Sequence, residues 1–392
     1  MLRRHLLTTA AATFVVASFA GTAFAADTVK IGFILPMTGQ QQTTGQETAA
    51  AIKLFQQLNG DTVAGKKIEV IIKDDGAVPD TTKRIAQELI VNEKVNFLAG
   101  FGITPCALAV APLATEAKIP EIVTAAGTSI ITEKSPYIVR TSFTLAQSTV
   151  PMADWAAQNG IKKVVSMVSD YAPGIDSEGS FKDEFTKKGG QIVEAIRFPL
   201  ANPDFAPFLQ RAGDAKPDAI FVFVPAGQGA AFVKQFLERG LDKQGIKIIG
   251  PGDVTDDQLL NGMGEQVIGT VTAHFYSADH DSKANKDYVT AFEKVSGGMR
   301  PNFMSVGGYD GMHLIYAALK KTNGDTDGDK LVAAMKGLQW ESPRGPISID
   351  PDTRDIIQNV YVRKVDKKNG QLYNVEFATF PSIKDPIKAA KK

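Results

Sequence analysis

The feature that most constrains this chain is a strand-then-helix alternation that runs along it twice. In the first run, apolar β-branched segments are followed by segments with helical spacing of their apolar residues. The expected strands are 29–35, 67–72, 95–99 and 119–124, and the expected helices are 48–58, 81–91 and 104–117. Because strands joined by helices lie parallel and are covered on both faces, this pattern predicts an α/β fold.

The alternation restarts after about residue 145. The expected strands are then 163–168, 191–198, 219–224 and 246–249, and the expected helices are 179–188, 205–212 and 229–239. Helices at 285–295 and 309–322 and a strand-rich tail over 347–378 follow. Two such runs in 392 residues predict two Rossmann-like lobes. The long tail predicts discontinuous domains joined by a multi-strand hinge.

The first 25 residues have the pattern of an export signal. Arg3 and Arg4 precede an apolar run, and Ala23-Phe24-Ala25 is a cleavage site with small residues at its ends. An uncleaved membrane anchor is the alternative, which the shortness of the apolar run disfavours. We expect cleavage near Ala25, by the general secretory or the twin-arginine route. The mature chain then divides into one lobe from 26–145 plus 277–350 and another from 146–276 plus 351–392.

The composition excludes several classes of function. The chain has 43 basic and 43 acidic side chains, so its charge gives no reason to expect nucleic acid or a membrane surface as a partner. Its single cysteine rules out an intramolecular disulfide framework and any cysteine-based metal cluster.

The sequence also lacks the usual signatures of catalysis. Gly100-Phe101-Gly102 is not completed by the third glycine of a dinucleotide fingerprint, and neither a phosphate loop nor a Gly-x-Ser-x-Gly motif is present. The stretch from His274 to Asp281 resembles a metal cluster in composition, but its spacing matches no established ligand pattern. A solvated polar loop after a strand is the preferred interpretation. We therefore expect no enzymatic activity, no cofactor and no metal.

Residues 100–105 have the features of an anion-binding site. Open parallel sheets bind ligands beyond the carboxyl ends of their strands, and this segment follows the expected strand at 95–99. Thr104 is suited to cap the next helix and Pro105 to its first turn, while Gly102 lets the backbone approach a ligand closely. The positive end of the helix dipole favours a carboxylate there.

Further candidates follow other strands of the two runs. The loop from Ala125 to Ser129 ends the neighbouring strand with small residues whose N–H and hydroxyl groups can converge on the same anion. Ordinary capping and turn chemistry explains each loop alone, but their place on neighbouring strands favours a ligand site. In the second lobe, Tyr171 either covers a ligand or packs its own loop. Asp253 either meets a ligand or caps the helix that follows it.

At these residues the sequence resembles the leucine/isoleucine/valine-binding family of type I periplasmic binding proteins, which are receptor components of ABC importers. The resemblance covers the mature chain. An ordered set of motifs carries it: Val29-Lys30-Ile31-Gly32, Pro36-Met37-Thr38-Gly39, Lys73-Asp74-Asp75, Ile119-Pro120, Ala126-Gly127-Thr128 and Gly307-Gly308-Tyr309-Asp310.

The resemblance implies a periplasmic solute receptor that closes at a hinge around a small carboxylate. It implies that Thr104, Ala126 and Thr128 bind the carboxylate through N–H and hydroxyl groups, and that Tyr171 closes over the ligand. It also implies an ABC permease and ATPase as partners, and we expect the receptor to be a monomer. The alternative function is a ligand sensor of a signalling system, because the same fold serves as a receptor ectodomain.

Departures from the family pattern bear on the ligand. Amino-acid receptors of this family carry an acid that pairs with the ligand ammonium, and here the spacing places Gly252 at that position and Asp253 one residue later. Phe101 is unlike the branched-chain receptors, and we include it with Gly102 among the candidate ligand-binding residues. The stretches 300–305 and 340–345 look closer to relatives that bind aromatic acids. Branched-chain or other amino acids and aromatic acids therefore both stay open as ligands.

Overall fold

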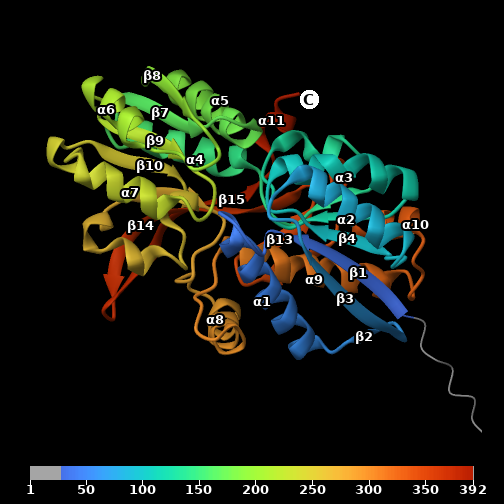
Figure 1. The fold of residues 1–392 in the computed structure, drawn as a ribbon. Helices are drawn as coiled ribbons and strands as arrows, with labels where there is room; N and C mark the ends of the chain where they lie inside the picture. The colour runs from blue at the N-terminus through green and yellow to red at the C-terminus, as the bar shows by residue number, and fades with distance from the viewer. Residues whose placement is uncertain (1–27, 392) are drawn as a thin grey trace, which may run out of the picture.

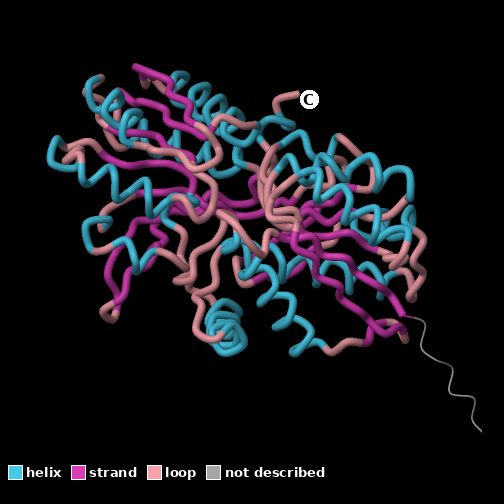
Figure 2. The backbone as a smooth tube through the Cα atoms, viewed as in Figure 1, coloured by secondary structure: helices cyan, strands magenta, loops and turns pink. Residues whose placement is uncertain are grey.

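The computed structural model describes residues 28–391 as two α/β lobes that lie side by side (Figure 1). Each lobe is built on its own sheet with helices packed against it, so the predicted fold class is confirmed. Figure 2 shows that strands run through the middle of each lobe and that helices cover them. The expected signal peptide, 1–25, lies outside the described residues.

The first lobe contains a six-stranded sheet in the order β2-β3-β1-β4-β5-β6, parallel except for the edge pair β2 and β3. Its strands are β1 (Thr28–Leu35), β2 (Thr62–Val63), β3 (Lys66–Asp74), β4 (Phe97–Gly100), β5 (Glu121–Val123) and β6 (Ile138–Arg140). Its helices are α1 (Gln42–Asn59), α2 (Pro79–Val91), α3 (Thr104–Ala117), α9 (Phe303–Lys321) and α10 (Gly328–Met335). Because successive side chains of a strand point to opposite faces, Phe33 packs with α1 and α9 while Ile34 packs with α2 and α3.

The second lobe contains a nine-stranded sheet in the order β12-β13-β14-β11-β10-β9-β7-β8, with β15 paired to β14. The five strands from β8 to β11 are parallel and the others are antiparallel. The parallel strands are β7 (Lys163–Ser169), β8 (Gln191–Phe198), β9 (Ala219–Phe223), β10 (Lys247–Pro251) and β11 (Val271–His274). The antiparallel strands are β12 (Gln339–Ser342), β13 (Gly345–Ile349), β14 (Ile356–Lys368) and β15 (Gln371–Ile383). The remaining helices are α4 (Leu145–Gln158), α5 (Ala172–Lys187), α6 (Ala206–Asp214), α7 (Gly229–Glu238), α8 (Lys283–Ser296) and α11 (Pro386–Ala389).

The late strands tie the two lobes together. The backbone of β13 pairs with β14 in the second sheet, yet the side chains of Ile347 and Ile349 pack in the core of the first lobe. A strand shared in this way blurs any single boundary near residue 350. The domain limits expected from the sequence therefore stay a prediction.

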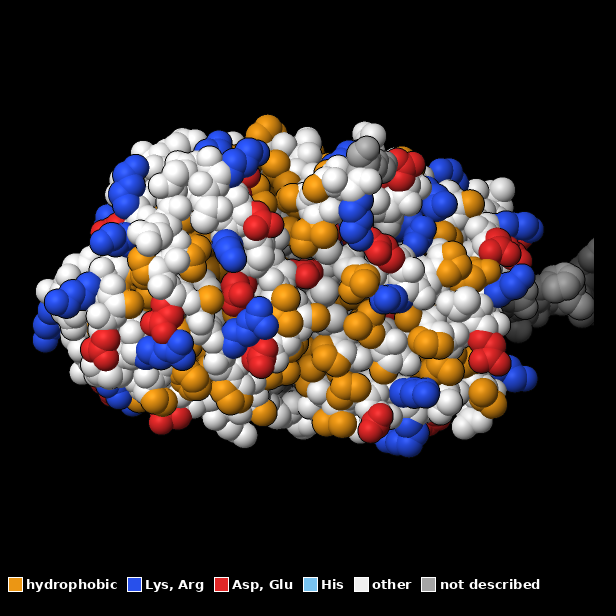
Figure 3. All heavy atoms as spheres, turned by 90° about the horizontal axis from the view of Figure 1, so that it is seen from above, with side chains coloured by type: hydrophobic (Ala, Val, Ile, Leu, Met, Phe, Trp, Pro, Cys, Tyr) orange, Lys and Arg blue, Asp and Glu red, His pale blue; other side chains and the backbone are white. Residues whose placement is uncertain are grey.

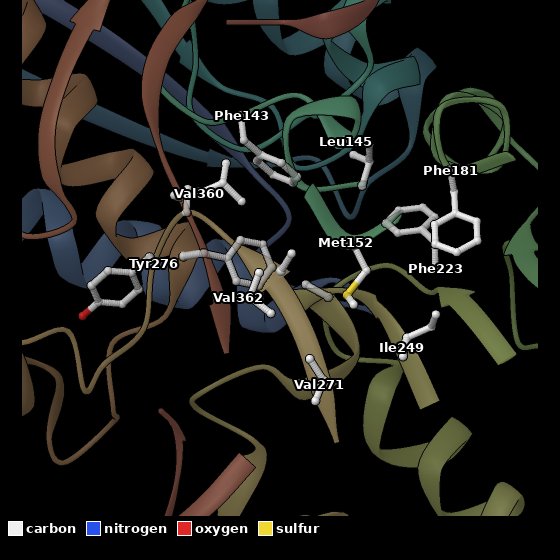
Figure 4. Packing of buried hydrophobic residues seen from close by; sticks show 14 of the residues in the cluster. Phe143, Leu145, Met152, Phe181, Phe223, Ile249, Val271, Tyr276, Val360 and Val362 are labelled. Atoms are coloured by element: carbon white, nitrogen blue, oxygen red, sulfur yellow. The ribbon is translucent and has the colours of Figure 1, made fainter. Parts of the chain in front are cut away.

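An apolar cluster also bridges the lobes. It joins Leu54 of α1 and Phe303 of α9 to Phe221 of β9 and Val362 of β14. Figure 4 shows side chains of this cluster converging from strands, loops and helices, among them Phe143 just before α4. Burying apolar surface is worth roughly 25 cal/mol per Å², so the cluster favours contact between the lobes.

Several elements differ from the sequence-based expectation. α1 begins at Gln42 rather than at residue 48, α5 at Ala172 rather than at residue 179, and α9 at Phe303 rather than at residue 309. In α1 and α5 the added first turns are rich in Gln, Thr, Gly and Pro, so hydrophobic periodicity does not extend into them. The helices and strands that were not expected are β2, β6, α4, β11, α10, β12 and α11. α4 contains Pro151, a residue that argues against a helix in the sequence. The capping box of Thr144 and Gln147 is the sequence signal for the start of this helix.

The surface shows mixed charge. Over the face in Figure 3, Lys and Arg side chains alternate with Asp and Glu side chains and form no patch of a single sign. Among the described helices, none is both long enough and apolar enough to cross a membrane.

A pair of glycine substitutions tests the close packing of α9 on the first sheet. A Cβ at Gly307 lies 2.3 Å from the carbonyl oxygen of Thr124, whereas a Cβ at Gly179 in α5 meets nothing within 4 Å. We expect Gly307→Ala to lower the free energy of unfolding by about 1–3 kcal/mol, because backbone must shift. Gly179→Ala should leave it unchanged or raise it by about 0.5–1 kcal/mol. Denaturant unfolding of both variants checks this, and equal effects would contradict the packing.

Candidate ligand-binding site

A small cavity lies where the carboxyl ends of the parallel strands of both sheets meet. From the first lobe and the start of α4 it is lined by Gln41, Gly102, Ile103, Thr104, Ala125, Ala126, Gly127, Phe143, Leu145 and Met304. From the second lobe it is lined by Tyr171, Pro173, Phe223, Pro225, Ala226 and Asp253. The space open to the centre of a water molecule is about 20 Å³, so the cavity has room for about one water. A larger ligand therefore needs the two sides to move apart.

The loop after β4 brings Gly102 and Thr104 to the cavity. A Cβ at Gly102 would lie 2.6 Å from Cγ of Pro36, so only glycine lets this loop approach the loop after β1 so closely. Thr104 was expected to cap α3, but Ile103 occupies the cap position and Thr104 is the first helical residue. Its hydroxyl is therefore free to turn to Thr128, with the two Oγ1 atoms 2.7 Å apart.

The loop after β5 is held in place by contacts on its far side. The guanidinium of Arg140 donates to the carbonyl oxygen of Thr128 at 2.6 Å. The backbone N–H of Ala126 donates to the carbonyl oxygen of Phe101 at 3.1 Å. That N–H was expected to meet a carboxylate, and in this structure it is already committed to the neighbouring loop. The hydroxyls of Thr104 and Thr128 are both buried at this end and bond to each other.

Phe101 does not line the cavity. Its side chain is fully buried among Ile34, Val110 and Val123 in the first lobe, and its backbone has a φ of 68°. A left-handed conformation costs a bulky residue free energy, which this burial offsets. Phe101 thus shapes the loop, and its role as a ligand contact is not supported by its position.

The second lobe contributes an aromatic wall. Tyr171 directly precedes α5, and its ring stacks on Phe223 with centroids 6.1 Å apart and planes inclined by 19°. Burial and the charge of Asp253 raise the pKa of the Tyr171 hydroxyl, so this group stays protonated at neutral pH. Tyr171 therefore presents both an apolar face and a hydrogen-bond donor.

Asp253 is the acidic residue of the cavity lining. It lies in a 3-10 turn, Gly252–Thr255, directly after β10, and Pro251 occupies the cap position of that turn. Burial raises the pKa of Asp253 to about 7, reinforced by the charge of Asp256 and opposed by its own backbone N–H and by Arg363. Its Oδ2 is buried without a hydrogen-bond partner.

The sequence-based interpretation of His274 as part of a solvated polar loop is wrong. His274 ends β11, is fully buried, and packs on Phe143 and Phe303 with ring centroids 5.2 and 4.3 Å away. Burial, then the charges of Arg363 and Arg344, hold the pKa of His274 well below its usual range. Among the residues described, no group of His, Cys, Asp and Glu is arranged to hold a metal ion.

Two hydrogen-bonded contacts hold the lobes closed at the edges of the cavity. The Gln40 amide donates to Oδ1 of Asn202 at 2.5 Å and accepts from the Asn202 backbone N–H at 3.3 Å. On the other side, the backbone N–H of Ser129 donates to Oδ2 of Asp176 at 2.9 Å. Both contacts join a residue of the first lobe to one of the second.

Sequence reasoning missed part of the apolar lining. Phe143 and Leu145 lie between β6 and α4, two elements that were not expected, and the capping box that starts α4 is the signal for their place. Met304 lies in the stretch 300–305, and the likeness of this stretch to aromatic-acid receptors is a sequence signal that it belongs to the site. Phe223 is the last residue of β9, and the apolar pattern of that strand does not distinguish its last residue from the others.

Because of Asp253, the free energy of unfolding should decrease as the pH rises from about 4 to 7. Its pKa of about 7 in the folded chain exceeds the value of an unfolded Asp, so the folded state binds more protons between about pH 4 and 7. We therefore expect Asp253→Asn to raise the free energy of unfolding at pH 8, by at most about 4 kcal/mol, and to change it little at pH 4.5. Denaturant unfolding at both pH values measures this.

Asp218 provides the control. Hydrogen bonds from the backbone N–H groups of Lys163 and Lys162 lower the pKa of this exposed carboxyl, although burial partly opposes them. Asp218→Asn should therefore lower stability at pH 8. If the free energy of unfolding at pH 8 rises for both variants, or for neither, the environment assigned to Asp253 is contradicted.

Comparison with known proteins places this architecture. Residues 28–371 match the family described as periplasmic binding protein. The chain is 69% identical to a solute-binding protein of an ABC transporter from Rhodopseudomonas palustris BisB5, solved with 3,4-dihydroxybenzoic acid, with a TM-score of 0.91 over 92% of this chain and 99% of that one. It is 45% identical to an R. palustris solute-binding protein solved with 4-hydroxybenzoate, with a TM-score of 0.90 over 93% and 100%. It is 44% identical over 373 residues to Leu/Ile/Val-binding protein homolog 6 of Brucella abortus, which covers 94% of this chain and 96% of that protein.

Two α/β lobes that close on a shared cavity define a hinged receptor for a small molecule. The chain belongs to the periplasmic binding protein family. The predicted resemblance and the predicted role as a solute-binding receptor of an ABC transporter are confirmed. Such receptors are not enzymes as a family, and the absence of catalysis in this chain stays a prediction.

Proposed function

We propose that this receptor captures an aromatic carboxylic acid between its lobes and delivers it to an ABC permease and ATPase. The observation that carries the proposal is the pairing of two kinds of surface in one cavity. Thr104 lines one side, and the buried hydroxyl of Thr128 lies directly behind it, outside the lining, at 2.7 Å from the Thr104 hydroxyl. Aromatic and apolar side chains form much of the rest of the lining. The relatives solved with 3,4-dihydroxybenzoic acid and 4-hydroxybenzoate support the same ligand class.

The hydroxyl pair accounts for the carboxylate. An ionised carboxylate taken out of water must be met by donors, since leaving it unpaired is far costlier than leaving it in solvent. The hydroxyls of Thr104 and Thr128 now bond to each other, and each can rotate to donate to a ligand oxygen instead. Thr104 also begins α3, whose N-terminal dipole favours a negative charge.

The walls account for the ring. The rings of Tyr171 and Phe223 are stacked nearly parallel, and Phe143, Leu145 and Met304 of the lining add apolar surface. Aromatic rings gain free energy from both area burial and stacking. A flat ring held between such walls, with its carboxylate toward the hydroxyl pair, satisfies both surfaces.

An α-amino acid is the competing ligand. It would need an anionic partner for its ammonium, and Asp253 is the acid of the cavity lining. Gly252 stands where the family's amino-acid receptors carry their acid, so we favour the aromatic acid. Export with cleavage near Ala25 and a monomeric state remain part of the proposal.

Direct binding tests the ligand class. We expect isothermal titration of the mature chain to show binding of benzoate or a hydroxybenzoate and none of leucine. Benzamide, which keeps the ring but lacks the charge, should bind at least about tenfold more weakly than benzoate, because hydrogen bonds to charged groups are worth about 1.5–3 kcal/mol. Tight binding of leucine without binding of any aromatic acid would contradict the proposal.

Removing one hydroxyl tests the carboxylate site. Thr104→Val keeps the shape of the side chain but deletes a donor, so we expect affinity for the acid to fall by about 1–3 kcal/mol. Thr115→Val is the matched control on the same helix: its hydroxyl bonds to Ala111 and Ser135, outside the cavity. Titration of both variants should separate them, and equal affinities would remove Thr104 from the site.

Removing an aromatic ring tests the wall. Tyr171→Ala deletes the ring that stacks on Phe223, so we expect weaker binding of every aromatic acid. Trp155→Ala is the control, because this half-buried ring packs near Phe377 away from the cavity lining. Unchanged affinity in Tyr171→Ala would show that the wall does not contact the ligand.

A further inference from the structure

The cavity contains an unsatisfied acceptor that the proposed carboxylate and ring contacts do not use. Oδ2 of Asp253 is buried and has no hydrogen-bond partner, although Asp253 lines the cavity and is only 3% exposed. Buried polar atoms are almost always paired, and an unpaired one costs free energy. Such an atom in a cavity wall points to a partner that arrives with the ligand.

The protein side cannot supply that partner. Nε2 of His274 lies 3.7 Å from Oδ2 of Asp253, which is beyond hydrogen-bond distance. His274 is fixed where it stands, because its Nδ1 accepts the backbone N–H of Phe275 at 3.0 Å and its ring packs on Phe303. With Nδ1 accepting, a neutral ring carries its proton on Nε2, and this atom is also without a partner. The His274 ring therefore cannot approach Oδ2 of Asp253 without breaking its contacts with Phe275 and Phe303.

Arg363 does not satisfy Asp253 either. Its guanidinium bonds to the carbonyl oxygens of Tyr276 and Gly252 and to the hydroxyl of Thr272, and it pairs with Asp257 at 3.4 Å. Its charge favours an ionised Asp253 from a distance. Asp253 is therefore an acceptor without a donor, because the guanidinium of Arg363 bonds to other groups.

We propose that Asp253 accepts a hydrogen bond from a ring hydroxyl of the ligand, and that the receptor thereby selects hydroxylated aromatic acids over the unsubstituted acid. The inference rests on the proposed function and deepens it. Asp253 follows β10 of the second lobe, whereas Thr104 and Thr128 belong to the first. A ligand with a carboxylate at one end and a hydroxyl on its ring therefore bonds to both lobes at once, and its hydroxyl supplies the partner that Oδ2 of Asp253 lacks.

The hydroxyl also favours closure. Differential affinity for the closed state is what shifts a hinged receptor toward it. An aromatic acid without a hydroxyl leaves Oδ2 of Asp253 buried and unpaired when the lobes close. A site built for a hydroxyl rejects the analogue that lacks it for this reason.

A ligand series with wild-type protein tests the proposal. Titrations at pH 8 compare benzoate, 4-hydroxybenzoate, 3,4-dihydroxybenzoate and 3,4-difluorobenzoate, the last being similar in shape but unable to donate. We expect at least one hydroxylated acid to bind about tenfold or more tightly than benzoate, and the difluoro acid to bind no better than benzoate. If the difluoro acid matches the dihydroxy acid, or if all four bind equally, the proposal is wrong.

Two variants locate the effect. Asp253→Ala should bring the hydroxylated acids to within about threefold of benzoate, while benzoate itself still binds. Asp256→Asn is the matched control: Asp256 is buried in the same stretch of chain and raised in pKa to about 6 mainly by burial, but it bonds to Asn302 and does not line the cavity. It should keep the wild-type preference. A preference that survives in Asp253→Ala overturns the assignment.

The failures can be told apart. If wild-type protein binds no aromatic acid, the proposed function fails and this inference with it. If it binds benzoate and the hydroxylated acids equally, the proposed function stands and the inference alone is overturned. Should Asp253→Ala fail to fold, the wild-type ligand series decides by itself.

Discussion

A negative charge can be held inside a protein only where donors replace its water, and that constraint organises the site. The hydroxyls of Thr104 and Thr128 lie 2.7 Å apart at the carboxyl ends of neighbouring parallel strands, shielded by both lobes. In the closed structure they satisfy each other, so neither is left unpaired. In the complex that we propose, a carboxylate replaces this mutual bond with two hydrogen bonds of its own.

The strand order explains why both lobes face this point. In each sheet an early strand, β1 or β7, lies between its successors, which creates the crevice at the carboxyl ends where α/β proteins bind ligands. The late strands β13, β14 and β15 then hold the two sheets as neighbours (Figure 1). Gln40 with Asn202 and Ser129 with Asp176 close the rims. Asn302 of the first lobe also donates to the carboxylate of Asp256 in the second. A ligand that contacts both lobes adds to these bonds and so favours the closed arrangement.

Much of this arrangement could be predicted from the sequence, because apolar β-branched runs and helical spacing report burial directly. The strands leading to Thr104, Tyr171 and Asp253 were found in this way. What failed depends on contacts remote in sequence. The sequence predicts Thr104 as a helix cap, because it does not show that Thr128 lies beside it. It predicts His274 in a polar loop, because it does not show that Phe143 and Phe303 surround the ring. Phe101 was expected to contact the ligand because it lies in the loop before α3, yet its backbone has a positive φ and its side chain is buried in the core.

A crystal structure of the mature chain with 4-hydroxybenzoate would show which way the ligand lies between the lobes. We expect the carboxylate oxygens to lie within hydrogen-bond distance of the Thr104 and Thr128 hydroxyls, with the ring against Tyr171. A carboxylate turned toward the second lobe, or a ligand bound outside the cavity between the lobes, would contradict this orientation.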